Sequence, residues 1–213
     1  PRIRLIQNEE RLGLAESLNK GIQLARGKYI ARIDADDLCH PQRFEQQVAF
    51  LEKNEEYGVC GSWQHHWGLD TEWIHKPPVE HEELKACFIF RCELCHSTLM
   101  LRKAAFVDNN LYYDHTFAAE DYELWTRAIH KFKFGNLPEV LGEYRVGTDN
   151  ITANKLQKLS VESGEIAARK LKTYLGVSVK ELSDLLKNYK EEYVFVVFNA
   201  KQNTTITPSK WEV

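Results

Sequence analysis

The chain has 213 residues, of which 43% are hydrophobic, enough for one medium-sized domain or a domain with an appendage. Its 28 basic and 31 acidic side chains leave a net charge of −3, which argues against nucleic acid as a partner. Five cysteines and the lack of a signal-peptide pattern favour reduced thiols in the cytoplasm over a disulfide framework. No apolar run approaches the roughly 20 residues that span a bilayer, so we expect no integral membrane segment.

The N-terminal part has the pattern of a strand, a helix and a second strand. Apolar and basic residues alternate over residues 3–6, and apolar residues then recur at helical spacing over residues 14–25. The second strand, predicted at residues 28–33, leads directly into three carboxylates, those of Asp34, Asp36 and Asp37. In open α/β sheets, ligands bind at this carboxyl edge of the strands.

Helices and strands continue along the chain. In order, the pattern predicts a helix at 41–51, strands at 58–63 and 73–76, a helix at 81–90, a strand at 97–101, helices at 103–107 and 120–131, and strands at 132–134 and 140–146. In the helix that begins at Pro41, the expected inward face is Phe44, Val48 and Leu51. The last two strands are expected to flank a turn at Asn136–Leu137–Pro138.

The pattern changes beyond residue 150. A long charged helix is predicted at residues 156–175, and Ser178 and Glu181 form a candidate capping box before another helix. We therefore divide the chain into residues 1–152 and a C-terminal helical extension, residues 153–213. The apolar run at residues 193–198 could pack on the core, dimerise or touch a membrane surface, and core packing is the default.

Two groups of acidic residues are the candidates for cation binding and catalysis. Alternate residues of an extended backbone share a face, so Asp34 and Asp36 can hold one cation, and their hard oxygens suit Mg²⁺ or Mn²⁺. A helix cap would explain one of the three aspartates but hardly all of them. Asp121 lies beside Glu120 and can serve as a base toward a hydroxyl, although ordinary helix N-terminal charge explains this pair equally well when it is taken alone.

Six ordered segments carry a family resemblance. They are N-E-E-R-L-G-L-A at 8–15, A-R-G-K-Y-I-A-R-I-D-A-D-D at 25–37, residues 41–51, H-S-T-L-M-L-R at 96–102, A-E-D-Y-E-L-W at 119–125 and L-P-E-V-L-G-E-Y-R at 137–145. In this order the chain resembles the family 2 glycosyltransferases, inverting enzymes of the nucleotide-diphospho-sugar transferase (GT-A) fold. The resemblance covers about residues 3–152. It implies an α/β, Rossmann-like GT-A sheet flanked by helices.

The resemblance also implies roles for individual residues. Asp34 and Asp36 match the D-x-D positions that hold the divalent cation, Mg²⁺ or Mn²⁺, and the donor diphosphate, and Asp37 is the adjoining acid. Asp121 matches the catalytic base, with Glu120 beside it shaping the acceptor site. His96 matches a position near that site or, equally well, is a hydrogen-bonded structural histidine. Arg145 is a phosphate contact or, equally well, a structural ion pair.

The implied reaction moves a sugar from a nucleotide-diphosphate donor to a hydroxyl of a saccharide or lipid-linked acceptor, with inversion. Trp63 would offer an aromatic face to the acceptor, but packing within a surface hairpin is the more frequent use of such a residue. We expect the protein in the cytoplasm or peripherally at the inner face of the membrane, and a homodimer stays open.

Two departures from the family pattern are visible. The family usually begins with a strand, a helix and a second strand that bind the base, and this sequence starts after them, so we expect the nucleotide pocket to be incomplete within these residues. Gly147 stands where many relatives carry a histidine that contributes to the metal or diphosphate site. These departures motivate the alternative of a catalytically silent binding or assembly module. A nucleotidyltransferase is a third alternative, and A-E-D-Y-E-L-W argues against it.

The pair Cys92 and Cys95 could belong to a zinc or redox element, because C-x-x-C brings two thiols together. A second ligand pair at zinc-finger spacing is absent from the sequence. Free cysteines are therefore the favoured interpretation.

Overall fold

The computed structural model describes residues 3–68, 72–147, 155–176, 178 and 180–181. The helices are α1 (Leu14–Leu24), α2 (Arg43–Lys53), α3 (His81–Cys87), the short 3₁₀ helix η1 (His96–Thr98), α4 (Lys103–Val107), α5 (Glu120–Ala128) and α7 (Leu156–Leu175). The strands are β1 (Tyr29–Ala31), β2 (Leu38–Cys39), β3 (Tyr57–Trp67), β4 (Trp73–His75), β5 (Met100–Arg102) and β6 (Lys133–Arg145). This succession confirms the expected mixed α/β class.

One six-stranded sheet organises the fold. Its strand order is β1-β5-β3-β6-β2, and β4 pairs with β3 beside this path. The long pair β3 and β6 is parallel, whereas the other pairs are antiparallel. The parallel pairing carries the end of β6 to the segment that follows β1, where Leu38 pairs with Glu143. The sheet thereby holds the three aspartates between β1, β2 and the end of β6.

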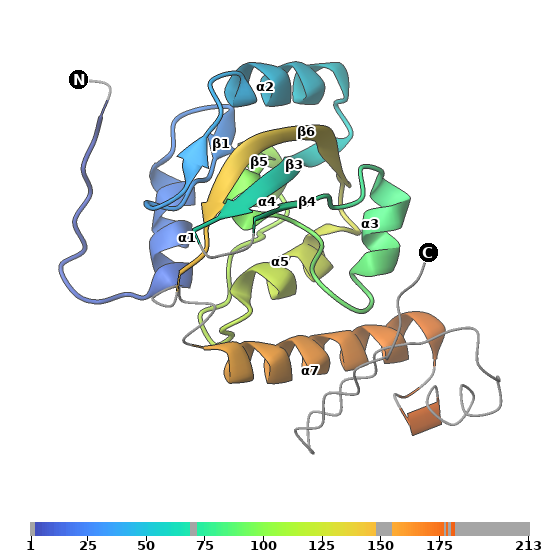
Figure 1. Ribbon diagram of the computed structural model, residues 1–213. Helices are drawn as coiled ribbons and strands as arrows, with labels where there is room; N and C mark the ends of the chain where they lie inside the picture. Colours follow the sequence, from blue (N-terminus) through green and yellow to red (C-terminus); the bar gives the residue numbers. More distant parts are fainter. Residues whose placement is uncertain (1–2, 69–71, 148–154, 177, 179, 182–213) are drawn as a thin grey trace.

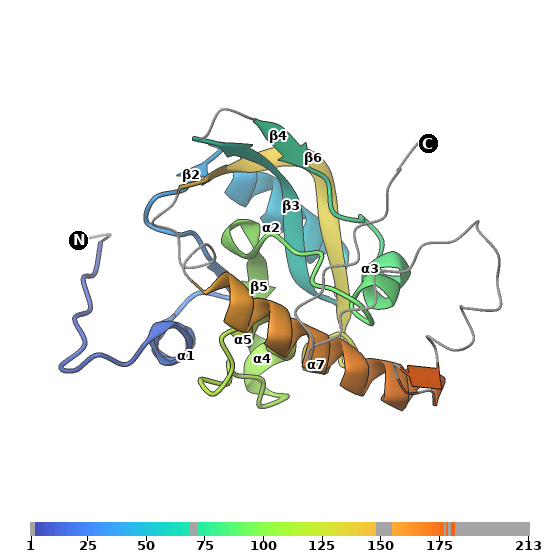
Figure 2. The ribbon, with the colours of Figure 1, turned by 60° about the horizontal axis from the view of Figure 1, so that its bottom comes forward.

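Alternation along the strands divides the core into two layers. Cys60 and Met100 pack with Leu51 of α2 on one face, and their neighbours Val59 and Leu101 belong to the larger cluster on the other face. That larger cluster also contains residues of α1, α3, α4, α5 and α7. Figures 1 and 2 show α2 on one side of the sheet and α5 and α7 on the other.

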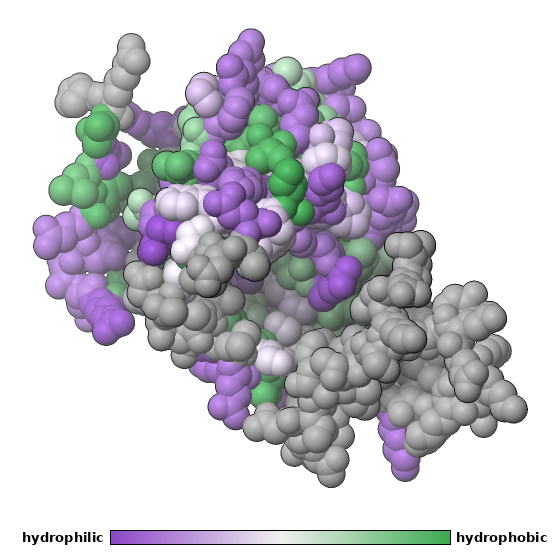
Figure 3. All heavy atoms as spheres, in the orientation of Figure 1, coloured by the Kyte–Doolittle hydropathy of each residue, from purple (hydrophilic) through white to green (hydrophobic). Residues whose placement is uncertain are grey.

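The predicted strand at residues 3–6 is wrong. These residues form neither helix nor strand, and the side chains of Ile3 and Leu5 are 87% and 91% exposed. In Figure 3 this segment stands away from the body of the protein with apolar surface on it. An alternating segment forms a strand only where another strand offers its backbone, and no described strand pairs with residues 3–6.

The expected inward face of α2 is confirmed for Leu51 and Val48, which pack in the core, and is wrong for Phe44. Phe44 is 52% exposed, and the buried residues are Arg43, Gln47 and Leu51. The apolar spacing predicted the wrong side for Phe44, because this helix buries the polar side chains of Arg43 and Gln47 and leaves the aromatic ring exposed to solvent.

The expected turn at Asn136–Leu137–Pro138 lies inside one continuous strand, β6. Leu137 pairs with Ser62 and Val140 with Trp63, so two residues of β6 bulge between successive partners on β3. One of them is Pro138, which has no N–H to offer and is tolerated in a strand at a bulge. The two predicted strands are therefore halves of one bulged strand.

The C-terminal helix α7 shares the hydrophobic core. Ile166 and Leu171 are 2% and 5% exposed, and Leu159 packs against the same cluster. After this helix, Ser178 N–H donates to Glu181 Oε2 at 2.6 Å and Glu181 N–H donates to Ser178 Oγ at 3.2 Å, which confirms the capping box. The run at residues 193–198 lies outside the described residues. Among the residues described, no helix is both long and apolar enough to cross a bilayer.

Candidate active site

The three aspartates occupy a turn between β1 and β2. Asp37 N–H donates to Asp34 O at 3.3 Å and closes the turn. The Asp37 side chain is buried, and its Oδ1 accepts the N–H of Arg145 at 3.0 Å. Its Oδ2 is also buried and meets no hydrogen-bond donor in the part of the chain that the structure describes. Asp37 therefore fixes the end of β6 to the turn and keeps one oxygen free.

Arg145, at the end of β6, also reaches the turn with its side chain. Its guanidinium lies 2.7 Å from Asp36 Oδ2, and about two fifths of the Asp36 side chain is exposed. The structure therefore brings together the four predicted donor-side residues, Asp34, Asp36, Asp37 and Arg145. The ion pair between Asp36 and Arg145 lies near the surface, where such a pair adds little stability.

Arg32 joins the aspartate turn to the second acidic group. Its guanidinium contacts Asp34 Oδ1, and its side chain is only 11% exposed. Burial raises the pKa of the Asp34 carboxyl, and the positive charge of Arg32 offsets only part of that rise. The same charge acts to lower the pKa of Glu120 and of Asp121. Arg32 thus contacts the first acidic group and acts electrostatically on the second, and the sequence pattern did not single it out.

Glu120 and Asp121 open α5, where the helix macrodipole favours negative charge. Burial, followed by repulsion from Asp121, raises the pKa of Glu120 to about 7. Burial also raises the pKa of Asp121, although its Oδ1 accepts the N–H of Tyr122 at 2.7 Å, which acts in the opposite direction. A carboxylate with a raised pKa is a stronger base than an ordinary aspartate.

His96, in η1, lies between Asp121 and Tyr113. Its Nδ1 is 3.8 Å from Asp121 Oδ2, and its Nε2 is 2.8 Å from the Tyr113 hydroxyl. Burial lowers the pKa of His96 far enough to keep the imidazole neutral, and burial raises the pKa of Tyr113. A protonated tyrosine that donates to Nε2 leaves the imidazole proton on Nδ1, the nitrogen that faces the carboxylate.

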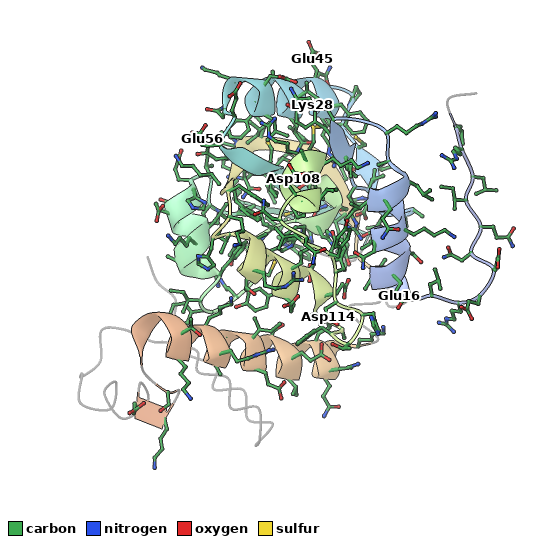
Figure 4. The ribbon with its side chains drawn as sticks, turned by 180° about the vertical axis from the view of Figure 1, so that it is seen from behind. Glu16, Lys28, Glu45, Glu56, Asp108 and Asp114 are labelled. Carbon is green, nitrogen blue, oxygen red and sulfur yellow. The ribbon has the colours of Figure 1, made fainter. Side chains whose placement is uncertain are left out.

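Tyr113 is held in turn by α1. The side-chain amide of Asn19 donates to Tyr113 O and accepts from Tyr113 N–H, both at 2.8 Å. Close by, His115 Nδ1 lies 3.5 Å from Glu16 Oε1, and Figure 4 marks this region with the labels Glu16 and Asp114. Asn19 and Tyr113 are 94 positions apart in the chain, so helical spacing alone could not have revealed this support.

The short helix that carries His96 is fixed to β3 by its next two residues. Gln64 Nε2 donates to Ser97 Oγ at 2.7 Å, and Ser62 N–H donates to Thr98 Oγ1 at 3.3 Å. Ser97 and Thr98 are both buried. The position of His96 is thus set by a rigid support rather than by a free loop.

Trp63 is placed differently from the other predicted residues. Its Nε1 donates to Pro77 O at 3.3 Å, and Lys76 Nζ lies 5.1 Å from the ring centroid. Both partners come from the segment that follows β4, and neither is a candidate site residue. The five cysteines, including Cys92 and Cys95, are free.

The chemistry of the side chains limits the kind of metal site that the protein can offer. The described residues include no group of three or more histidine, cysteine or carboxylate side chains that could enclose an ion. Asp34 and Asp36 nevertheless offer hard oxygens at one turn, and Asp37 Oδ2 is an oxygen without a donor. Mg²⁺ is commonly held by one or two carboxylates together with substrate phosphates. The residues thus fit a cation that shares its ligands with a diphosphate, and do not fit an all-protein cage.

The raised pKa of Glu120 predicts a stability that depends on pH. The pKa is about 7 in the folded protein against an ordinary 4.5, and the residue is 8% exposed. Its contribution is complete below pH 4.5 and is lost as the pH rises through 7, at a cost of roughly 3 kcal/mol in the free energy of unfolding. Glu120→Gln should therefore stabilise the protein at pH 8 and change little at pH 5, as measured by urea unfolding. Glu165→Gln, at an exposed position, is the control, and equal effects at both pH values would contradict the prediction.

Comparison with known proteins identifies relatives of this chain and solved structures of the same fold. The amylovoran biosynthesis glycosyltransferase AmsE of Erwinia amylovora is 28% identical over 80% of this chain and 64% of its own length. The fold matches S. aureus TarS in complex with UDP-GlcNAc, with a TM-score of 0.53 at 14% identity over 84% of this chain and 57% of that one. It also matches the mannosyltransferase PcManGT of Pyrobaculum calidifontis in complex with GDP-Man and Mn²⁺, with a TM-score of 0.50 at 16% identity over 88% and 63%. These likenesses confirm the expected GT-A fold.

The share of each chain that the matches cover determines what they show about this protein. The chain spans about 60% of the length of the curated relatives that it matches over most of its own residues. The sequence profile described as "Glycosyl transferase family 2" matches residues 1–109. The match covers half of the chain and includes the aspartate turn and His96, so the chain belongs to glycosyltransferase family 2.

Proposed function

We propose that this chain carries the donor and acceptor groups of a metal-dependent, inverting glycosyltransferase, which moves a sugar from a nucleotide diphosphate to a hydroxyl. The observation that carries the proposal is a pair of acidic groups, one at Asp34–Asp37 and one at Glu120–Asp121, on both of which the charge of the largely buried Arg32 side chain acts. Family membership supports it, as do the nucleotide sugars bound to TarS and PcManGT.

On the donor side, Asp34 and Asp36 would hold Mg²⁺ or Mn²⁺ together with oxygens of the diphosphate. When bound, the cation supplies Lewis-acid stabilisation of the negative charge that develops on the leaving diphosphate. Arg145 already faces Asp36, and a diphosphate at the turn would offer its guanidinium a second anion in bidentate geometry. Mn²⁺ in the PcManGT complex supports this assignment.

On the acceptor side, Asp121 would remove the proton from the attacking hydroxyl. The hydroxyl oxygen then forms a bond to the anomeric carbon as the bond from that carbon to the diphosphate breaks, and the nucleoside diphosphate leaves with the electron pair. The attack comes from the face opposite the leaving group, so the configuration inverts in one step. His96, neutral and with its Nδ1 toward Asp121, would hold the carboxylate in place without competing for the proton.

The acceptor and the cellular setting are further parts of the proposal. The acceptor would be a hydroxyl of a saccharide or of a lipid-linked molecule, and Glu120 would shape that site. A peripheral position at the inner face of the membrane would bring the enzyme to a lipid-linked acceptor. Two further predictions are that Trp63 contacts the acceptor and that the protein forms a homodimer.

The test is a turnover assay with a panel of UDP- and GDP-sugars in Mn²⁺, followed by NMR of the anomeric proton of the product. We expect hydrolysis or transfer of at least one donor and a product of inverted configuration. If no donor shows metal-dependent binding or turnover, the silent binding module becomes the better description.

Metal removal gives a separate prediction. Excess EDTA should lower turnover to below about one hundredth, because the cation contributes several kcal/mol to the transition state, and added Mn²⁺ should restore it. Asp36→Asn should raise the Mn²⁺ concentration needed for half-maximal rate, whereas Asp108→Asn, at an exposed position, should not. Full activity in EDTA would contradict metal dependence.

A further inference from the structure

The turn before α5 is held by a residue from the C-terminal helix. Glu162 Oε2 accepts a short hydrogen bond from Ala118 N–H and a second from Ala119 N–H at 3.0 Å. These are the two residues directly before Glu120 and Asp121. Ala119 is the N-cap of α5, and no side-chain hydrogen bond caps the helix from its own turn. Glu162 thus binds, from α7, the N-cap N–H that the N3 glutamate binds in a capping box, together with the N–H of the residue before it.

Glu162 is held firmly by the helix that carries it. Its side chain is 14% exposed, and Lys158 Nζ lies 3.6 Å from its other oxygen. Farther along α7, Ile166 and Leu171 are buried in the shared core. Figure 2 shows α7 running across α5. A carboxylate on so well anchored a helix can define the position of the backbone that it binds.

Two more contacts tie α7 to α5 and its preceding turn. Lys170 Nζ donates to Thr126 O at 2.9 Å, near the end of α5. The guanidinium of Arg169 lies 5.2 Å from the centroid of the Phe117 ring, just before Ala118. α7 therefore contacts α5 near its end and the turn before its start, and Glu162 makes the contact beside the acidic pair.

We propose that Glu162 is a positioning residue for the Glu120–Asp121 pair, which it holds in register with His96 and Arg32 through the backbone of Ala118 and Ala119. The inference rests on the proposed function, because it assigns Asp121 to the acceptor hydroxyl. A displacement of about 1 Å in a catalytic group can cost on the order of a hundredfold in rate. Loss of the two hydrogen bonds should therefore lower kcat without changing the donor KM, because Asp34, Asp36 and Arg145 are untouched.

Three substitutions distinguish the contributions of the hydrogen-bond acceptor, the negative charge and the side-chain length of Glu162. Glu162→Gln keeps an acceptor oxygen at the same distance and should keep kcat within about threefold of wild type. Glu162→Asp keeps the charge but is one methylene shorter, and Glu162→Ala removes the acceptor, so both should lower kcat by roughly 10- to 100-fold. Glu165→Ala, one turn away and exposed, is the matched control and should behave as wild type.

Hydrogen exchange supplies a readout that does not depend on turnover. In Glu162→Ala and Glu162→Asp the amides of Ala118 and Ala119 should exchange at least about tenfold faster, while the amide of Trp125 in the middle of α5 stays protected. Wild-type kcat in Glu162→Ala, unchanged exchange at Ala118 and Ala119, or equal losses in Glu162→Gln and Glu162→Ala would each overturn the inference. If Asp121→Asn stays active, the proposed function fails; if it is inactive while Glu162→Ala is fully active, only the role of Glu162 fails.

Discussion

Asp121→Asn is expected to lower the rate of sugar transfer by roughly a hundredfold to ten-thousandfold, the range that removal of a general base produces. The amide cannot take the proton of the acceptor hydroxyl. It still presents an oxygen to the N–H of Tyr122, a bond that measures 2.7 Å in the native protein. The start of α5 should therefore keep its structure, and the loss should appear in kcat with little change in the donor KM.

The matched control for this substitution is Asp108→Asn, which makes the same chemical change at the exposed end of α4 and should keep full activity. Circular dichroism and urea unfolding of both variants would show that the fold survives. If Asp121→Asn keeps more than about a tenth of the native rate, Asp121 is not the base and the proposed function fails.

The sequence motifs located the two acidic groups because each motif is local. Asp34, Asp36 and Asp37 follow directly from the pattern of a strand that ends in acids, and Glu120 and Asp121 from acids at the start of a helix. Structure was needed to show that the charge of Arg32 acts on both groups. A signal for Arg32 was nevertheless present, because Arg32 and Asp34 are alternate residues of an extended segment and so share a face.

Other supports of the site had no local signal. Tyr113 reaches His96 across 17 positions, and Glu162 reaches Ala118 across 44. Hydrogen bonds of this kind depend on how helices pack, whereas periodicity reports only which face of a helix is apolar. The same limit explains residues 3–6, where alternation predicted a strand but could not tell whether a partner strand lay beside it.

The buried side of α2 shows how an apolar pattern can miss a polar core. Arg43 is fully buried. Its guanidinium donates to Arg32 O at 2.7 Å, Ser97 O at 2.9 Å and Leu99 O at 3.0 Å, and its Nε donates to Gln47 Oε1 at 3.1 Å. This one side chain therefore ties the end of β1, just before the aspartate turn, to the backbone beside His96.

Arg43→Met should lower the free energy of unfolding by roughly 3 to 5 kcal/mol, because it buries an apolar chain of similar length and leaves Arg32 O and Ser97 O without this donor. Phe44→Ala is the matched control on the same helix; its ring is 52% exposed, and its loss should cost about 1 kcal/mol or less. Urea unfolding measures both. Because the lost bonds hold the two halves of the site, Arg43→Met should also lose turnover under conditions in which it is still folded. A cost below about 1 kcal/mol for Arg43→Met would mean that water or a rearranged Gln47 replaces its hydrogen bonds.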